Sequence, residues 1–253
     1  MRPLVIAFIA FVLAFGGAFA AMFIRSWLPA PHLSKETEGV VRLGIGLVAT
    51  MTALLLGLMT QAARSAFETQ DAAVRTSAAN ILTLDRHLAR FGPETKPTRD
   101  LILRAVTERV EQIWSSRGGR AAAASVAGAA VPVEEVENQI LRLVPQNDAQ
   151  RWFKGEALKL SEDVVKARWR ILGSGAGLVP IPFLVAVIFW LTVTFASFGL
   201  YAPRNATVVA VLAVTAISVA AAVFLILEFD EPFEGIIRVS SGPLRYALTQ
   251  LGQ

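Results

Sequence analysis

The chain of 253 residues contains no cysteine and only two histidines, His32 and His87. Without cysteine it can form neither a disulfide nor a thiolate nucleophile or metal site. Two histidines so far apart in sequence also argue against a histidine-rich metal site. Charged residues make up only 17% of the chain, against about 25% in typical soluble domains. Basic and acidic residues are interleaved rather than clustered, which gives no support for nucleic-acid binding.

Charged residues are not evenly spread: four long segments contain no Asp, Glu, Lys, Arg or His. These segments are 3–24, 43–63, 180–200 and 205–227. A helix of about 20 apolar residues, at ~1.5 Å per residue, crosses a bilayer core of ~30 Å. Each segment is long enough to do so. No alternating pattern typical of a β-strand occurs at useful length, so the predicted fold class is all-α.

The first segment could also be interpreted as a secretory signal peptide, because it follows Arg2 and ends in alanines. Its apolar run is longer than the ~7–15 residues of a typical signal core. It is followed by Arg25 and Trp27, which are suited to an interfacial anchor. We therefore expect a retained transmembrane helix.

The second segment predicts a helix that continues well beyond Ala63. Apolar residues recur at a spacing of seven with a second row between them: Phe67, Val74, Ile81, Leu84, Leu88 and Phe91. This pattern is typical of a packed helical seam, and Gly92-Pro93 should end the helix. Further helices are predicted over 98–114, 134–144 and 148–171, with a Gly/Ala-rich linker near 116–132.

These patterns predict an integral membrane protein whose cytosolic helical bundle is inserted between the second and third of four transmembrane helices. Residues 1–63 would carry transmembrane helices 1 and 2, and 64–177 the cytosolic helical region. Residues 178–228 would carry transmembrane helices 3 and 4, and 229–253 a cytosolic C-terminal tail with a short helix near Pro243.

The positive-inside rule gives the orientation. The side that holds both termini and the helical region carries Arg2, Arg64, Lys166, Arg168, Arg170 and Arg238 near the ends of the spans. The opposite side carries Arg25, Lys35, Arg42 and Arg204. The balance places the N-terminus, the C-terminus and the helical region in the cytoplasm.

The absence of charge from the spans argues against several mechanisms. Proton relays and intramembrane aspartyl or metalloproteases need ionisable groups inside the bilayer, and no nucleophile–base pair stands out. We therefore expect no enzyme activity. The second span instead presents an apolar stripe, which we take as the candidate pore lining: Leu47, Met51, Leu54 and Leu58. Its glycines would allow close helix approach: Gly44, Gly46 and Gly57.

Two polar features flank the fourth span. At its start, Asn205 can cap the helix and Arg204 can lie at the interface, or both can attract anions if several chains surround an axis. At its end lie four carboxylates, Glu228, Asp230, Glu231 and Glu234, around the bend at Pro232. They could clasp a hard cation such as calcium, although the spacing is not that of an EF-hand. Salt bridges with arginines of the helical region and solvation are the favoured interpretation.

Long stretches resemble a bacterial family of four-helix membrane proteins of unknown function, described as bestrophin-like. They are SFGLYAPRNATVVA, FLILEFDEPFEGIIRVSSGPLRYAL, VVRLGIGLVATMTALLLGLMTQAARSAFETQDAAV, AANILTLDRHLARFGPE and VPQNDAQRWF. Together they cover nearly the whole chain in the right order. The resemblance implies a protein of a bacterial inner (plasma) membrane that crosses it several times.

A more distant similarity to true bestrophins implies more. Those are pentameric anion channels with four spans per chain, cytosolic termini and a pore lined by the second span. Glu231, Pro232, Phe233 and Gly235 resemble the ENPFG-type segment that follows their last span. In animal members, acidic residues just beyond this segment clasp calcium. Here Glu234 stands between Phe233 and Gly235 and no aspartate run follows, so we expect no cofactor, with calcium as the alternative.

The function expected from these features is passive conduction of ions, with anions favoured, by a bestrophin-like oligomeric channel. Its partners would be the lipid bilayer and further copies of the chain, with no nucleic acid. The alternative is a non-conducting membrane scaffold or sensor whose cytosolic helices recruit a protein partner.

Overall fold

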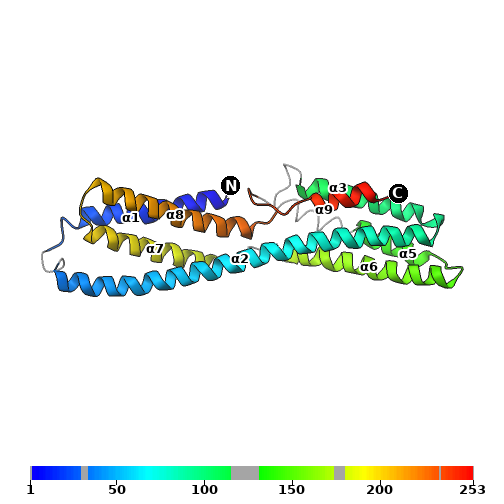
Figure 1. The fold of residues 1–253 in the computed structure, drawn as a ribbon, viewed down its shortest axis with the longest axis horizontal. Coiled ribbons are helices and arrows are strands. Elements are labelled where there is room, and N and C mark those ends of the chain that lie inside the picture. Colours follow the sequence, from blue (N-terminus) through cyan, green and yellow to red (C-terminus); the bar gives the residue numbers. More distant parts are fainter. Residues whose placement is uncertain (1, 30–33, 115–130, 174–179, 234, 253) are drawn as a thin grey trace. The chain divides into compact units, whose positions relative to one another are not determined.

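The structure, a computed structural model, describes all residues except 1, 30–33, 115–130, 174–179, 234 and 253. This described part is helical and contains no β-strand, which confirms the all-α prediction. In order, its elements are α1 (Arg2–Ile24), α2 (Lys35–Phe91), the 3-10 helix η2 (Pro93–Thr95), α3 (Lys96–Trp114), α5 (Val131–Arg142), α6 (Asp148–Gly173), α7 (Ile181–Tyr201), α8 (Ala206–Asp230) and α9 (Gly242–Gln250) (Figure 1). Most of the linker predicted near 116–132 lies outside the described residues, and its last two residues belong to α5.

Four helices, α1, α2, α7 and α8, are long and apolar enough to cross a membrane. Each covers one of the four uncharged segments to within one residue, and α2 extends well beyond its segment on both sides, so the prediction of four candidate spans is confirmed. α7 follows the extended residue Pro180. α8 begins after Asn205, whose side-chain Oδ1 accepts a hydrogen bond of 2.8 Å from the backbone N–H of Val208. This is the N-cap predicted from the sequence.

The helix α2 is continuous over 57 residues, about 85 Å at ~1.5 Å per residue. At its start, Ser34 Oγ accepts a hydrogen bond of 3.2 Å from the backbone N–H of Thr37. It ends at Phe91 because Gly92 has a φ of 152°, which residues with a side chain rarely adopt, and Pro93 follows. The predicted continuation beyond Ala63 to Gly92 is confirmed.

The chain divides into two compact units. The first comprises Met1–Ala66 and Gly177–Asp230 and holds α1, α7, α8 and the N-terminal part of α2. The second comprises Phe67–Ala176 and Glu231–Gln253 and holds the rest of α2 with α3, α5, α6 and α9.

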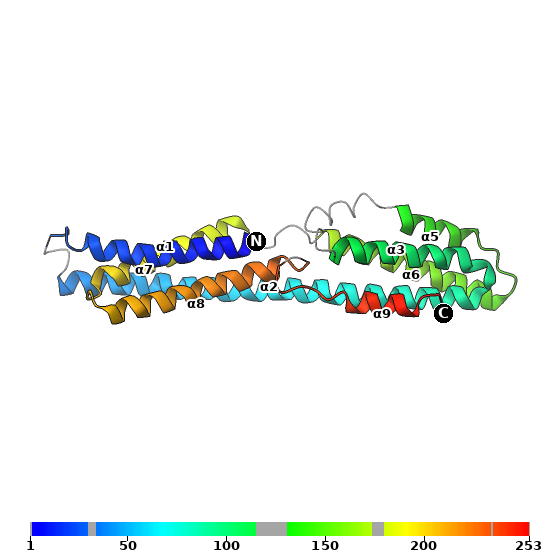
Figure 2. The same ribbon diagram turned by 90° about the horizontal axis from the view of Figure 1, so that it is seen from above.

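In the first unit, α1 packs against α7 and α8 through small residues (Figure 2). Its alanines at positions 10, 14 and 18 are all buried. A methyl group added to Gly199 of α7 would collide with the backbone of Ala18, and one added to Gly17 would lie 3.1 Å from Thr192 Cγ2. Small residues therefore bring α1 and α7 into close contact, as is common between membrane helices.

The glycines of α2 behave differently. Apart from the adjacent residues and the nearby backbone of α2 itself, no atom of the described residues lies within 4 Å of the position that a Cβ would take at Gly44, Gly46 or Gly57. The prediction that these glycines allow close helix approach is therefore wrong for contacts within the chain, because α1 and α7 supply the closely packed pair instead.

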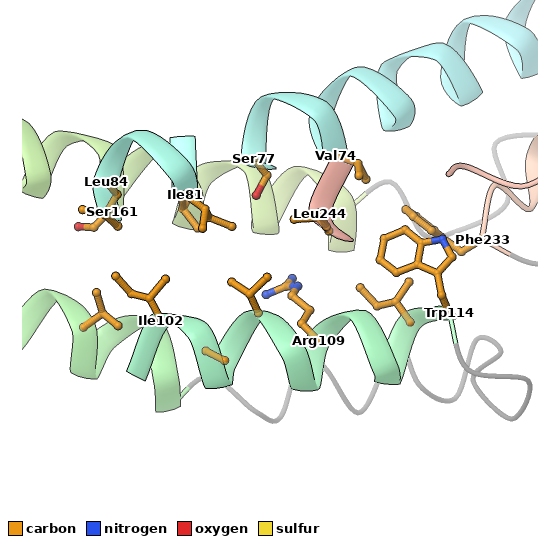
Figure 3. Close-up of a pocket in the computed structure, with 15 residues that line it drawn as sticks. Val74, Ser77, Ile81, Leu84, Ile102, Arg109, Trp114, Ser161, Phe233 and Leu244 are labelled. Atoms are coloured by element: carbon orange, nitrogen blue, oxygen red, sulfur yellow. The ribbon is translucent and has the colours of Figure 1, made fainter. Parts of the chain in front are cut away.

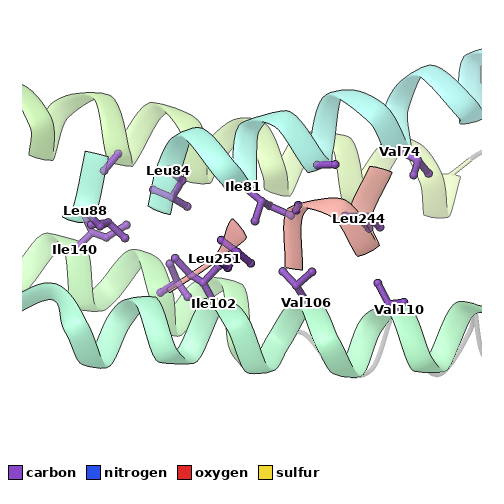
Figure 4. Packing of buried hydrophobic residues seen from close by; sticks show 14 of the residues in the cluster. Val74, Ile81, Leu84, Leu88, Ile102, Val106, Val110, Ile140, Leu244 and Leu251 are labelled. Carbon is purple, nitrogen blue, oxygen red and sulfur yellow. The ribbon is translucent and has the colours of Figure 1, made fainter. Parts of the chain in front are cut away.

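The second unit is built around the predicted seam of α2. Val74, Ile81, Leu84, Leu88 and Phe91 are all buried. Of these, Val74, Ile81, Leu84 and Leu88 pack in one cluster with residues of α3, α5, α6 and α9 and of the segments beside α9, including Ile102, Val106, Val110, Val136, Ile140, Ala157, Leu244 and Leu251 (Figure 4). The seam prediction is confirmed, and the seam is covered by the chain's own helices.

A buried ion pair joins α2 to α3. The Asp85 side chain is fully buried and that of Arg99 is 17% exposed. Arg99 donates from Nε to Oδ1 at 2.7 Å and from Nη2 to Oδ2 at 2.9 Å, a two-point geometry that strengthens the pair. The hydrogen bond from Arg99 to Asp85 raises the pKa of Arg99, so the arginine stays charged. The pair therefore fixes the register of the two helices.

Candidate functional site

The predicted pore-lining residues form one exposed stripe along the membrane part of α2. Leu47, Met51, Leu54 and Leu58 have exposed fractions of 65%, 51%, 66% and 60%. Three- and four-residue spacings keep all four on one face of a helix. Such an apolar face contacts lipid, other copies of the chain, or the lumen of a pore.

The opposite face of α2 is packed within the first unit. Met59 and Ala63 are buried in a cluster with Val187 of α7 and Ile226 of α8. Thr52 lies on the same side and donates its hydroxyl to the carbonyl of Val48 at 2.7 Å. The fold therefore fixes which face of α2 the chain leaves uncovered.

At one end of the first unit, two arginines bond to backbone carbonyls at helix ends. Arg204, in the α7–α8 turn, donates from Nε to the Met22 carbonyl in the last turn of α1 at 3.2 Å. Its guanidinium also lies 5.5 Å from the ring centroid of Phe23. Arg25 in turn donates to the Ala202 carbonyl just after α7 at 2.9 Å. Cations are favourable at helix C-termini because of the helix dipole, so this exchange of arginines joins α1 to α7.

The sequence reasoning named Arg204 and Asn205 as anion-attracting candidates and missed Arg25 as a partner. The structure assigns Asn205 to capping α8 and Arg204 to the carbonyl of Met22. The local signal for Arg25 was its position directly after an apolar helix. Attraction of anions by these residues stays a prediction.

The four carboxylates lie at the end of α8 and in the bend that follows it. Glu228 and Asp230 lie in the last turn of α8 in the first unit, and Glu228 is buried. Glu231 belongs to the second unit, and Glu234 lies outside the described residues. Among the described residues, no group of three or more His, Cys, Asp or Glu side chains is placed to hold a metal ion. The calcium clasp thus stays a prediction.

A tight bend follows α8 and contains Pro232, Phe233 and Gly235. The segment that includes this bend, residues 231–239, contacts α3, and we call it the exit segment. The backbone N–H of Val239 donates to the carbonyl of Pro232 at 2.8 Å, which closes the bend. Gly235 has a φ of 81°, which favours glycine. The bend therefore depends on the Pro232 carbonyl and on the glycine at position 235.

Trp114, at the end of α3, holds the exit segment in place. Its ring meets that of Phe233 edge to face at a centroid distance of 5.9 Å. Its Nε1–H donates to the Val239 carbonyl at 2.8 Å. The two residues are 125 positions apart, so no local pattern could have identified this contact.

A cavity of about 80 Å³ lies inside the second unit between α2 and α3 (Figure 3). Its walls are mostly aliphatic, with Trp114 and Phe233 at one end. Arg109 of α3 and Ser77 of α2 extend into it from opposite sides. The sequence reasoning missed this cavity, because its lining comes from five helices and the exit segment.

Comparison with known proteins gives one family and one fold. A family model described as Bestrophin-like domain matches residues 10–244, nearly the whole chain. No match was found among curated proteins.

Solved structures of bacterial Bestrophin homologs from Klebsiella pneumoniae have a similar fold. One structure, of a point mutant, has a TM-score of 0.69 at 16% identity and covers 97% of this chain and 99% of that chain. A second, solved by Zn-SAD phasing, has a TM-score of 0.69 at 14% identity and covers 96% of both chains. Another point mutant has a TM-score of 0.70 at 15% identity and covers 97% of this chain and 98% of that chain. Identities this low establish a shared fold and no more.

Proposed function

The chain belongs to the Bestrophin-like family, and from this premise we propose that it forms an oligomeric membrane channel that conducts ions passively. In this proposal, copies of the chain surround an axis and α2 of each copy faces the lumen. The stripe at Leu47, Met51, Leu54 and Leu58 forms the constriction. An apolar constriction can gate conduction by excluding water.

The observation that carries the proposal is the uncovered face of α2. In the most apolar window of α2 only 11% of residues are buried, against 28% in α1, α7 and α8. The helix is therefore the least covered of the four spans by its own chain. A single chain of four spans is also too small to enclose a pore, so conduction requires several copies.

Two further features support a preference for anions and a cytoplasmic second unit. The similarity to bestrophin anion channels favours anions. Arg25 and Arg204 add positive charge at the end of the first unit where α1 and α7 have their C-termini. The balance of Lys and Arg near the spans supports a cytoplasmic position for both termini and the second unit. The resemblance to bacterial bestrophin-like proteins supports a bacterial inner membrane. In this proposal, conduction requires no bound cofactor.

Cysteine labelling tests the assignment of the pore face, because the chain has no cysteine of its own. A charged, water-soluble thiol reagent reacts with the thiolate, which forms only in contact with water. In liposomes it should label Leu54→Cys and Leu58→Cys. It should not label Met59→Cys, which is buried against α7.

The matched control is Val214→Cys on α8. Val214 is 64% exposed within the chain, much like Leu54 at 66%, but it lies on a helix that the proposal does not place at the lumen. Equal labelling of Val214→Cys and Leu54→Cys, or no labelling of Leu54→Cys in a folded oligomer, would contradict the proposed pore face.

A second candidate function is a scaffold or sensor that recruits a protein partner. The seam at Val74, Ile81 and Leu88 does not support it, because the chain's own helices cover that seam. A different observation does: Leu141, Val144 and Trp152, around the α5–α6 connection, are more than half exposed. Two results together would favour this function. The intact protein would bind a partner in stoichiometric amount and the Trp152→Ser variant would not, and liposomes that hold the protein would show no ion flux.

A further inference from the structure

A groove of about 360 Å³ opens in the first unit between the start of the membrane part of α2 and the end of α7. Farther along α2 the two helices are in contact, where Met59 and Ala63 pack in one cluster with Val187 and Leu191. At the groove α2 presents a glycine. Beyond its chain neighbours and the nearby backbone of α2, Gly46 has no described atom within 4 Å of the position of a Cβ. The groove is therefore space that the chain itself leaves unfilled.

The walls of the groove are mostly apolar, among them Ile45, Ala49 and Phe198. At about 10–15 Å³ for each water-sized group, its volume of about 360 Å³ accommodates about 24 to 36 such groups. This is far more than an ion requires. Apolar walls of this extent suit an alkyl chain, because burial of apolar surface is favourable.

The groove lies at the depth where the polar and apolar parts of a lipid meet. Arg42 is the last charged residue before the uncharged segment 43–63, and Tyr201 is the last residue of α7. Arginine and tyrosine at the ends of spans lie at the interface between membrane and water. Ala49 lies about 10 Å farther along α2 than Arg42, at ~1.5 Å per residue, and so faces the hydrocarbon. A phospholipid matches both parts of such a groove.

The polar rim of the groove carries both signs of charge. Among the described residues that line it, Arg42 alone is charged, and it pairs with Glu38 one helical turn earlier. Their side chains are 71% and 27% exposed, so both remain accessible to a head group. A guanidinium has five N–H donors, which one carboxylate does not use up, and the hydroxyls of Ser197 and Tyr201 can also donate. The rim thus offers donors to a phosphate and an acceptor to an ammonium group.

We propose that this groove binds a zwitterionic diacyl phospholipid of the phosphatidylethanolamine class. The phosphodiester accepts hydrogen bonds from Arg42 and Tyr201, and the ammonium group lies beside Glu38. One acyl chain runs along Ile45 and Ala49. Because the ion pair has no net charge, a head group with both charges fits it better than one with a net negative charge. The proposal requires a chain embedded in a membrane and does not depend on conduction.

Native mass spectrometry of the intact, delipidated protein in detergent tests the proposal. The probes are phosphatidylethanolamine, phosphatidylglycerol and diacylglycerol with identical acyl chains. We expect saturable binding of phosphatidylethanolamine, about tenfold tighter than that of diacylglycerol, which lacks the phosphate that accepts charge-assisted hydrogen bonds. Phosphatidylglycerol should lie between the two. Equal binding of phosphatidylethanolamine and diacylglycerol, phosphatidylglycerol binding at least as tightly as phosphatidylethanolamine, or no binding would each overturn the proposal.

Variants of α2 locate the site. Gly46→Leu fills the groove and Arg42→Gln removes the charged donor, so each should weaken phosphatidylethanolamine binding by about tenfold. Gly44→Leu is the matched control and should bind as wild type. Gly44 lies on the same helix, has equally open surroundings and does not line the groove. Wild-type binding in Gly46→Leu or in Arg42→Gln, or an equal loss in Gly44→Leu, would refute the site.

Glu38→Gln tests the head-group assignment. It removes the carboxylate beside Arg42 and leaves the rim with a net positive charge, so the preference should reverse in favour of phosphatidylglycerol. An unchanged preference in the folded variant would contradict the placement of the ammonium group at Glu38.

A neighbouring copy of the chain is the other occupant that could fill the groove. Native mass spectrometry separates monomer from oligomer, so it distinguishes the two occupants. The proposal predicts bound phosphatidylethanolamine in both forms. Lipid bound to the monomer and absent from the oligomer would show that a second copy covers the groove, and would overturn the proposal.

Discussion

Replacing Asp85 by asparagine should loosen the second unit, whereas the same change at Asp71 should not. Both aspartates lie on α2, and each accepts a hydrogen bond from an arginine Nε at 2.7 Å. The two pairs differ in burial. The side chains of Asp85 and Arg99 are 0% and 17% exposed, and those of Asp71 and Arg75 are 26% and 64% exposed.

Burial sets the expected magnitudes. Removing one partner of a buried ion pair costs about 3–5 kcal/mol, because the remaining charge stays buried without its partner. Since Arg99 retains some access to solvent, Asp85→Asn should lie at the lower end, near ~3 kcal/mol. An exposed pair one helical turn apart contributes only about 0.3–0.5 kcal/mol. At ~1.4 kcal/mol for each factor of ten, the first change corresponds to about a 100-fold shift in the opening equilibrium and the second to about twofold.

Amide hydrogen exchange of α3 measures this difference directly in the full chain. We expect protection of its central amides to fall about 100-fold in Asp85→Asn, following the ~3 kcal/mol above, and to stay near wild type in Asp71→Asn. The double variant Asp85→Leu with Arg99→Met should regain most of the protection, because packed apolar residues can replace a buried pair. Equal protection in Asp85→Asn and Asp71→Asn would refute the claim that the Asp85–Arg99 pair holds α3 against α2.

Three further changes test other contacts. Gly199→Ala should lower the free energy of unfolding by ~1–3 kcal/mol through collision with the backbone of α1, whereas Gly57→Ala should leave it unchanged or slightly raised. If denaturant titrations show Gly57→Ala to be the less stable of the two variants, the packing of α1 on α7 is contradicted. Trp114→Phe removes a hydrogen bond worth ~1 kcal/mol, so the exit segment should be cleaved about fivefold faster by protease, while the exposed Trp27→Phe should behave as wild type. Asn205→Ala removes the α8 cap and should cost ~1 kcal/mol, measured as a lower thermal midpoint; an unchanged midpoint would argue against the cap.

The helices were predictable because their causes are local. An uncharged run of about 20 residues leaves few alternatives to a membrane helix, and the end of α2 follows from Gly92 and Pro93 alone. The spacing of Val74, Ile81 and Leu88 likewise identified the buried face of α2. Family membership was also predictable, since the stretches that carry the resemblance extend over most of the matched region.

The contacts that build the sites were not predictable, because they join residues distant in sequence. Asp85 and Arg99 look like ordinary surface charges until α3 folds back on α2. Trp114 finds its acceptor 125 positions away, and Arg25 finds its acceptor 177 positions away. The sequence periodicity identified the stripe at Leu54, but what covers a helix face in the assembly depends on neighbouring copies.

Ion flux through the purified protein in liposomes tests the channel proposal most directly. Vesicles that hold a folded oligomer should release chloride faster than empty vesicles and faster than they release sodium. In Leu54→Cys, reaction with a charged thiol reagent should change this flux, whereas the same treatment of the cysteine-free chain should not. Flux equal to that of empty vesicles, with the oligomer shown to be folded, would contradict the proposal that this member of the Bestrophin-like family conducts ions.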